Sequence, residues 1–116
     1  MKIALRVRSD FRVRVLTDRP TGIQGAFEGH ISRHPPKLIK SLFETNFISR
    51  VIAIPTHALE IALSREHNAQ TSADGFETSP EIEEILEAVA FVLDPDGRME
   101  RVAYERLEPL WHQHIG

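Results

Sequence analysis

The sequence predicts a small α+β protein, and three features lead to that class. The first fifteen residues alternate between apolar and charged side chains, which is the period of a β-strand. Residues 37–47 and 80–89 place their apolar side chains at helical spacing. Residues 48–54 are rich in β-branched side chains and precede a proline, as in a short buried strand. We expect an N-terminal antiparallel β-hairpin joined to a small sheet that packs against two to three helices.

Length and composition predict a single globular domain over residues 1–116. A chain of 116 residues with 41% hydrophobic content can bury a core without a metal ion or a disulfide bond. The sequence has no cysteine, which excludes disulfides, a thiol nucleophile and a cysteine-based zinc site. The lack of cysteine suits a cytoplasmic protein.

Membrane insertion and secretion are not expected. Arg6 and Arg8 follow the first apolar residues too closely for a signal peptide to form. The longest apolar run, residues 88–93, is far shorter than the ~20 residues that a membrane helix needs. We therefore expect a soluble protein without a membrane partner.

The N-terminal alternation assigns each side chain to one face of a hairpin. Apolar residues occupy odd positions: Ile3, Leu5, Val7, Phe11, Val13 and Val15. Arginine occupies even positions: Arg6, Arg8, Arg12 and Arg14. The apolar series is interrupted at Ser9-Asp10, which indicates a turn between two strands.

The hairpin register depends on the length of that turn. A two-residue loop would place Val7 opposite Arg12 and mix apolar and charged side chains on one face. A three-residue loop over residues 8–10 pairs Val7 with Phe11 and keeps the faces separate, so we favour it. The favoured register also places Arg6 opposite Arg12, a like-charge pair that costs stability unless an anion binds there.

The middle of the chain predicts alternating elements. The glycines and proline of residues 18–29 indicate a turn and an irregular strand around residues 23–27. A helix over residues 37–47 and a strand over residues 48–54 follow. Thr56 is a suitable cap for a second helix, with an apolar side made of Leu59, Ile61, Ala62 and Leu63. Residues 68–79 are polar and predict a mobile surface loop.

The C-terminal third has a clear helix start and an ambiguous continuation. Ser79-Pro80-Glu81 combines a cap, a first-turn proline and an acid, so a helix should begin there. In one interpretation, residues 88–93 and 98–104 are strands around a Pro-Asp-Gly turn. In the other, the helix continues to Leu93 and a second helix follows Asp94-Pro95. We favour the strands.

The two halves of the chain carry opposite charge. Residues 1–50 contain ten Lys and Arg against four Asp and Glu, a net charge of +6. Residues 51–116 contain four against thirteen, a net charge of −9. This asymmetry indicates a charged partner, or contact between the halves within one molecule or between two.

The arginines of the hairpin form a candidate basic binding face: Arg6, Arg8, Arg12 and Arg14. A β-ribbon with such a row can contact nucleic-acid phosphates. The net charge of −3 and pI of 6.1 argue against that use, because nucleic-acid-binding domains are usually basic. Arginine on an exposed strand also simply deters aggregation. We therefore rank a protein partner, including a second copy in a homodimer, above nucleic acid.

Metal, cofactor and catalytic motifs are weak. The histidine pairs His30/His34 and His112/His114 have spacings that supply at most half a metal site, so we assign no metal. No glycine-rich phosphate loop or nucleophile elbow occurs, so we assign no cofactor and no catalytic residue. A small enzyme with a site assembled from His and carboxylate side chains remains the third hypothesis.

The sequence thus favours an interaction or regulatory (accessory) protein with a basic hairpin face and an acidic helical face. Phe47 and Trp111 are candidate interface anchors, because large rigid apolar side chains supply most of the energy at binding hot spots. Packing in the core is the alternative role for both.

Overall fold

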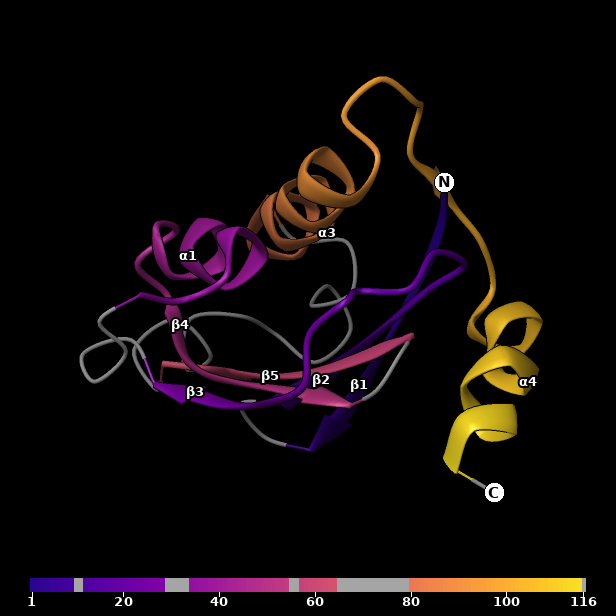
Figure 1. Cartoon of the computed structure of the whole chain (residues 1–116), viewed down its shortest axis with the longest axis horizontal. Helices are drawn as coiled ribbons and strands as arrows, with labels where there is room; N and C mark the ends of the chain where they lie inside the picture. The colour runs from indigo at the N-terminus through magenta and orange to yellow at the C-terminus, as the bar shows by residue number, and fades with distance from the viewer. Residues whose placement is uncertain (10–11, 29–33, 55–56, 65–79, 116) are drawn as a thin grey trace.

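Six β-strands form one mixed sheet, with helices packed on both of its faces (Figure 1). This computed structural model describes residues 1–9, 12–28, 34–54, 57–64 and 80–115, without the side chains of residues 8, 9 and 112–115. The strands are β1 (Lys2–Ser9), β2 (Arg12–Thr17), β3 (Gly25–Glu28), β4 (Ile48–Ile54), β5 (Ala58–Leu63) and β6 (Glu100–Arg101). The helices are α1 (Lys37–Phe43), α3 (Pro80–Leu93) and α4 (Tyr104–Ile115). The predicted α+β class is confirmed.

The strands lie in the order β3-β4-β5-β2-β1-β6. β6 runs parallel to β1, and every other neighbouring pair is antiparallel. The N-terminal hairpin therefore lies inside the sheet, with β2 bonded to β5 and β1 bonded to the short β6. Segments distant in sequence thus become neighbours across the sheet.

The hairpin forms as predicted, but its register is shifted by two residues. Val7 pairs with Val13, not with Phe11, and Arg6 pairs with Arg14, not with Arg12. The expected loop over residues 8–10 was wrong because β1 continues to Ser9, and an irregularity after Val7 changes the pairing. A shift of two is one full strand period, so every described side chain keeps its predicted face. Phe11 lies outside the described residues.

The elements at residues 25–54 follow the prediction with one shortened helix. β3 and β4 form at the expected places. α1 ends at Phe43, before the expected end at residue 47, and Asn46 adopts a left-handed φ of 71° that directs the chain away from the helix axis. Phe47 consequently leaves the helix and is buried in the core with 3% of its surface exposed.

The helix predicted after Thr56 was wrong, because residues 58–63 form strand β5. Leu59, Ile61 and Leu63 alternate with smaller or polar residues, which is the period of a strand, and they pack inward. Pairing with both β2 and β4 stabilises this conformation more than a local helix signal could. Thr56 lies outside the described residues.

The favoured β-hairpin at residues 88–104 was also wrong, and the helical alternative is closer. α3 starts at Pro80, as predicted, and continues to Leu93, because Val89 and Ala90 extend its buried stripe. The next helix, α4, begins only at Tyr104, and β6 lies before it. The loop expected over residues 68–79 lies outside the described residues.

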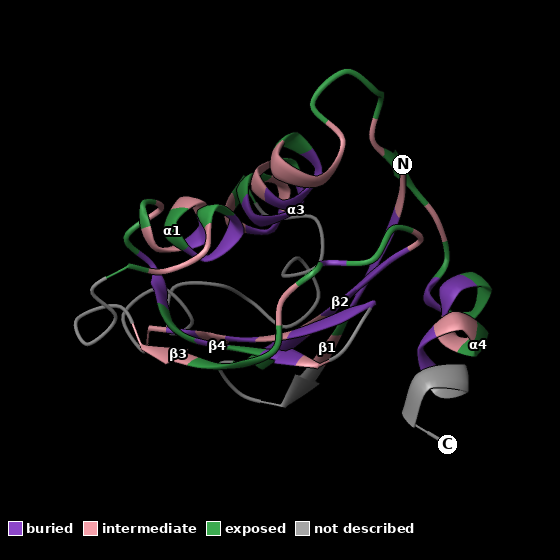
Figure 2. Ribbon diagram, viewed as in Figure 1, coloured by how far each residue is buried: buried purple, intermediate pink, exposed green. Residues whose placement is uncertain are grey.

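The two faces of the sheet carry different cores (Figure 2). One face packs beneath α1 and α3 through aliphatic side chains from four strands, β1, β2, β4 and β5. Its fully buried members include Ile3, Val13, Val15, Val51, Leu59, Ile61, Ile82, Ile85 and Leu86. Each such side chain contributes roughly 1.5–3 kcal/mol by leaving water, so this face dominates the stability of the fold.

The opposite face has a smaller core beneath α4. It joins Ala4, Leu16 and Ala58 of the sheet to Tyr104, Leu107 and Trp111 of α4. Small alanine side chains on the strands leave room for the two aromatic rings. Among the described helices, none combines the length and apolar character that crossing a membrane requires.

Candidate functional site

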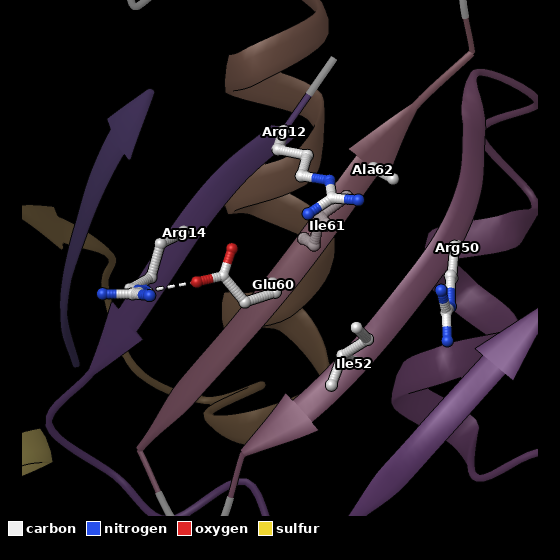
Figure 3. Close-up of a pocket in the computed structure, with 7 residues that line it drawn as sticks. All are labelled: Arg12, Arg14, Arg50, Ile52, Glu60, Ile61 and Ala62. Atoms are coloured by element: carbon white, nitrogen blue, oxygen red, sulfur yellow. Dashed lines mark hydrogen bonds and ion pairs between the residues drawn. The ribbon is translucent and has the colours of Figure 1, made fainter. Parts of the chain in front are cut away.

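The face of the sheet that carries α4 is only partly covered. α4 packs over β1 and β2, and its core also includes Ala58 at the start of β5 and borders Ile54 of β4, whereas Ile52 of β4 stays exposed. Figure 3 views this open face with helices lying behind the sheet. We call it the open face and define it by Arg12, Arg14, Arg50, Ile52, Glu60 and Ala62.

Strand pairing arranges these six side chains in two rows. Arg12, Ala62 and Arg50 are direct neighbours across β2, β5 and β4. One strand period along, Arg14, Glu60 and Ile52 form the second row. Since adjacent strands lie about 4.8 Å apart, the backbones that carry Arg12 and Arg50 are about 10 Å apart.

The two rows enclose a hollow of about 310 Å³. Its floor is low because the residue between Arg12 and Arg50 is Ala62, whose side chain is a single methyl group. Ile52 lies beside the hollow with 36% of its surface exposed. Figure 3 shows Arg12 reaching from β2 across β5 toward Ala62, with Arg50 on the far side. The site therefore combines two cations with an apolar contact.

Arg14 is a fixed structural cation beneath α4. Its Nε donates a hydrogen bond to Glu60, and its guanidinium lies 4.1 Å from the ring centre of Trp111. A terminal nitrogen also lies 3.4 Å from the hydroxyl oxygen of Tyr104. Burial opposes the charge, but the hydrogen bonds to Tyr104 and Glu60 outweigh it and raise the pKa of Arg14. Arg14 is thus held by three neighbours and always charged.

Arg6 makes the second contact between the sheet and α4. Its guanidinium lies 4.0 Å from the ring centre of Tyr104, a cation–π geometry. The same group forms ion pairs with Glu105 at 2.7 Å and Glu108 at 3.7 Å. Arg6 and Arg14 therefore hold α4 against the sheet, and carboxylates of the same molecule largely neutralise their charges.

Arg12 and Arg50 are the available cations of the open face. Arg12 is exposed and makes no hydrogen bond or ion pair within the part of the chain that the structure describes. Arg50 has one partner, Glu28, at 3.9 Å, and both side chains are nearly half exposed. Such a long surface pair is worth about 0–1 kcal/mol, so a ligand carboxylate can replace Glu28 at little cost.

The structure divides the predicted basic face into arginines that contact α4, Arg6 and Arg14, and an exposed arginine, Arg12. It brings Arg6, Arg12 and Arg14 to one side of the sheet, whereas the side chain of Arg8 lies outside the described residues. It adds Arg50, which sequence reasoning missed. The sequence indicates that Arg50 and Ile52 lie on the same face of β4, because they are two residues apart. It does not indicate that β4 lies near β2, because strand order depends on tertiary structure.

The predicted interface anchors are buried within the chain. Phe47 packs in the core beneath α1 and α3, and Trp111 packs beneath α4 with 8% of its surface exposed. In this fold both contribute apolar contact within the molecule. Their role in an interface stays a prediction.

No metal-binding cluster is evident in the described part of the chain, where no three His, Cys, Asp or Glu side chains come together. His57 lies in the turn before β5 with 9% of its surface exposed. His30 and the side chains of His112 and His114 lie outside the described residues.

Comparison of the chain with protein-family models, with curated proteins and with solved structures finds no match. The functional argument therefore depends on the geometry of the open face.

Proposed function

We propose that this protein is an interaction or regulatory protein that binds an acidic segment of a protein partner on the open face of its sheet. The observation that supports this proposal is the pairing of two available arginines, Arg12 and Arg50, on either side of Ala62. A partner that presents two carboxylates beside an apolar side chain would satisfy both arginines and cover Ile52.

The Arg14–Glu60 pair supports a protein ligand by making one wall of the site rigid. Both side chains are mostly buried, with 13% and 18% exposed. A wall that is already ordered loses little conformational entropy when a partner binds.

Nucleic acid is disfavoured by the placement of the aromatic rings. Single-stranded nucleic acid is usually held by bases stacked on exposed aromatic side chains. Here Arg6 and Arg14 stack on Tyr104 and Trp111, and both rings are buried. Among the described residues, the open face itself carries no aromatic side chain.

Fluorescence anisotropy tests this proposal. The probe is a labelled helical peptide with Glu at positions i and i+3 and Phe at i+7, compared with a peptide that has Lys in place of Glu. We expect the chain to bind the acidic peptide and not the basic one. Binding should weaken as salt shortens the screening length from about 10 Å at 0.1 M to about 3 Å at 1 M.

The double variant Arg12→Ala/Arg50→Ala should weaken this binding by about tenfold or more, or roughly 1.4 kcal/mol and upwards. Arg98→Ala/Arg106→Ala removes the same charge from exposed positions elsewhere and should leave the affinity nearly unchanged. Failure to bind the acidic peptide at low salt would reject the proposal. Tighter binding of a single-stranded oligonucleotide that also depends on Arg12 and Arg50 would replace it with nucleic-acid binding.

A further inference from the structure

Two large apolar side chains are exposed in the described chain, and they lie on opposite sides of the molecule. Ile52 is 36% exposed on the open face, and Phe91 is 65% exposed on α3. α3 buries Ile85, Leu86 and Val89 against the other face of the sheet, so Phe91 points away from the sheet. A phenylalanine with 65% of its surface exposed is accessible to a partner.

The surroundings of Phe91 are acidic. Glu84, Glu87 and Phe91 follow the spacing i, i+3 and i+7, which places them on one stripe of the helix. This stripe is about 10 Å long, since an α-helix rises 1.5 Å per residue. Glu84 and Glu87 are exposed and make no ion pair within the described residues. We call these three residues the α3 stripe.

The α3 stripe and the open face match in chemistry. The stripe presents two carboxylates and one large apolar side chain. The open face presents two arginines, whose backbones lie about 10 Å apart, and one exposed aliphatic side chain, Ile52. The long side chains of Glu84 and Glu87 can pair with Arg12 and Arg50, and Phe91 supplies an apolar contact for Ile52 and the hollow beside it.

We propose that the acidic partner of the open face is a second copy of this chain, which docks through its α3 stripe. This inference rests on the function proposed above and identifies the partner. Glu84 and Glu87 of the docking copy pair with Arg12 and Arg50 of the receiving copy, and Phe91 covers Ile52. Both charged sets exist on every molecule, in keeping with the opposite charges of the two halves of the chain.

The contact is heterologous, because it joins two different surfaces. A symmetric contact between two open faces would oppose arginines, and one between two α3 stripes would oppose glutamates. Like charges across an interface cost binding energy, so both symmetric arrangements are disfavoured. Each docked pair keeps one free open face and one free α3 stripe, and the assembly therefore continues to grow beyond the dimer.

Sedimentation velocity across a wide concentration range tests the inference. At low salt, the average sedimentation coefficient of the intact protein should rise with concentration without a plateau at the dimer. At about 1 M salt, where the screening length is about 3 Å, the protein should sediment as a monomer. Excess acidic peptide, the probe described above, should also dissociate the chains.

Two variants locate the contact. Arg12→Ala/Arg50→Ala disables the open face, and Glu84→Gln/Glu87→Gln/Phe91→Ser disables the α3 stripe. Each variant alone should be monomeric. An equimolar mixture should form a 1:1 heterodimer and stop there, because it contains only one intact surface of each kind. Arg98→Ala/Arg106→Ala and Glu44→Gln/Asp96→Asn match the charge changes at other exposed positions and should still form chains.

The outcomes separate this inference from the function on which it rests. A protein that stays monomeric at every concentration, yet binds the acidic peptide through Arg12 and Arg50, overturns self-docking and leaves the proposed function standing. A protein that neither associates nor binds the peptide overturns both. A dimer that persists when the α3 stripe is disabled overturns the heterologous arrangement.

Discussion

The two faces of the sheet are held by different physical means. Beneath α1 and α3, aliphatic side chains exclude water and contribute no charge to the contact. Beneath α4, Arg6 and Arg14 stack on aromatic rings and pair with carboxylates. The first kind of packing closes its face of the sheet. The second covers β1, β2 and the start of β5, which leaves Arg50 and Ile52 of β4 exposed for binding.

The largest expected difference in stability is between alanine substitutions at two isoleucines that point to opposite faces of the sheet. Ile61 is completely buried beneath α3, whereas Ile52 on the neighbouring strand is 36% exposed. Ile61→Ala should destabilise the protein by about 2–4 kcal/mol, because it creates a cavity in the core. Ile52→Ala should cost less than about 1 kcal/mol. Urea unfolding monitored by circular dichroism measures both. Equal losses would show that the open face is also a packed core.

The next comparison is between two arginines on the same strand and the same face. Arg14→Ala should cost about 2 kcal/mol, since it leaves the mostly buried Glu60 without Arg14 and removes the cation from the Trp111 ring. Arg12→Ala should change stability by no more than about 0.5 kcal/mol. The same unfolding experiment distinguishes them. A costly Arg12→Ala would mean that Arg12 supports the fold and is not reserved for a ligand.

Arg6 should matter less than Arg14 to the docking of α4. Its ion pairs are exposed, with 45% of the Arg6 side chain and 71% of Glu105 accessible. Arg6→Ala should therefore cost about 0.5–1 kcal/mol, and the loss should shrink at high salt. Trp111 is the sole tryptophan of the sequence, so its fluorescence reports the docking of α4. Its emission should shift to longer wavelength in Arg14→Ala and stay nearly unchanged in Arg6→Ala.

The smallest effect concerns a charged contact at the end of α3. Asp94 accepts a hydrogen bond from the Met1 amino group at 3.0 Å, and Arg19 lies 3.5 Å away. The hydrogen bond to that amino group is the main cause that lowers the pKa of Asp94 below its ordinary value of 3.8. A lowered folded-state pKa stabilises the fold above the ordinary carboxyl range and loses that contribution as the pH falls through it.

Asp94→Asn should therefore flatten the acid limb of the stability curve and have its clearest effect near neutral pH. The measurement is the free energy of unfolding in urea between pH 7 and pH 3, compared with Asp96→Asn as a control at an exposed position. Identical acid limbs for the intact protein and Asp94→Asn would contradict a paired Asp94 carboxylate.

Much of the fold follows from local patterns. The alternation of residues 3–15 predicts a hairpin and the face of each side chain, and both are confirmed even though the register is shifted. The start of α3 at Pro80 and strand β4 also follow from nearby residues. One error occurs where tertiary pairing outweighs a local signal. Residues 58–63 carry a helix cap signal before them, but two neighbouring strands hold them extended.

In the candidate site too, some features follow from local sequence patterns and others depend on tertiary structure. The sequence identifies Arg6, Arg12 and Arg14 as residues of one face, because strand parity is a local property. It does not reveal that Arg14 lies beneath Trp111, that Arg12 is free among the described residues, or that Arg50 joins the site from a third strand. Those facts depend on where α4 docks and on the order of strands across the sheet.

The sequence by itself thus determined the N-terminal hairpin with its apolar and charged faces, the start of α3, and the opposite charges of the two halves. Only the tertiary structure decided which arginines hold the molecule together and which remain available to a partner. The physical reason is that the two properties depend on residues at different distances along the sequence. Side-chain direction is set by the backbone period within a few residues, whereas the environment of a charge is set by groups that are distant in sequence.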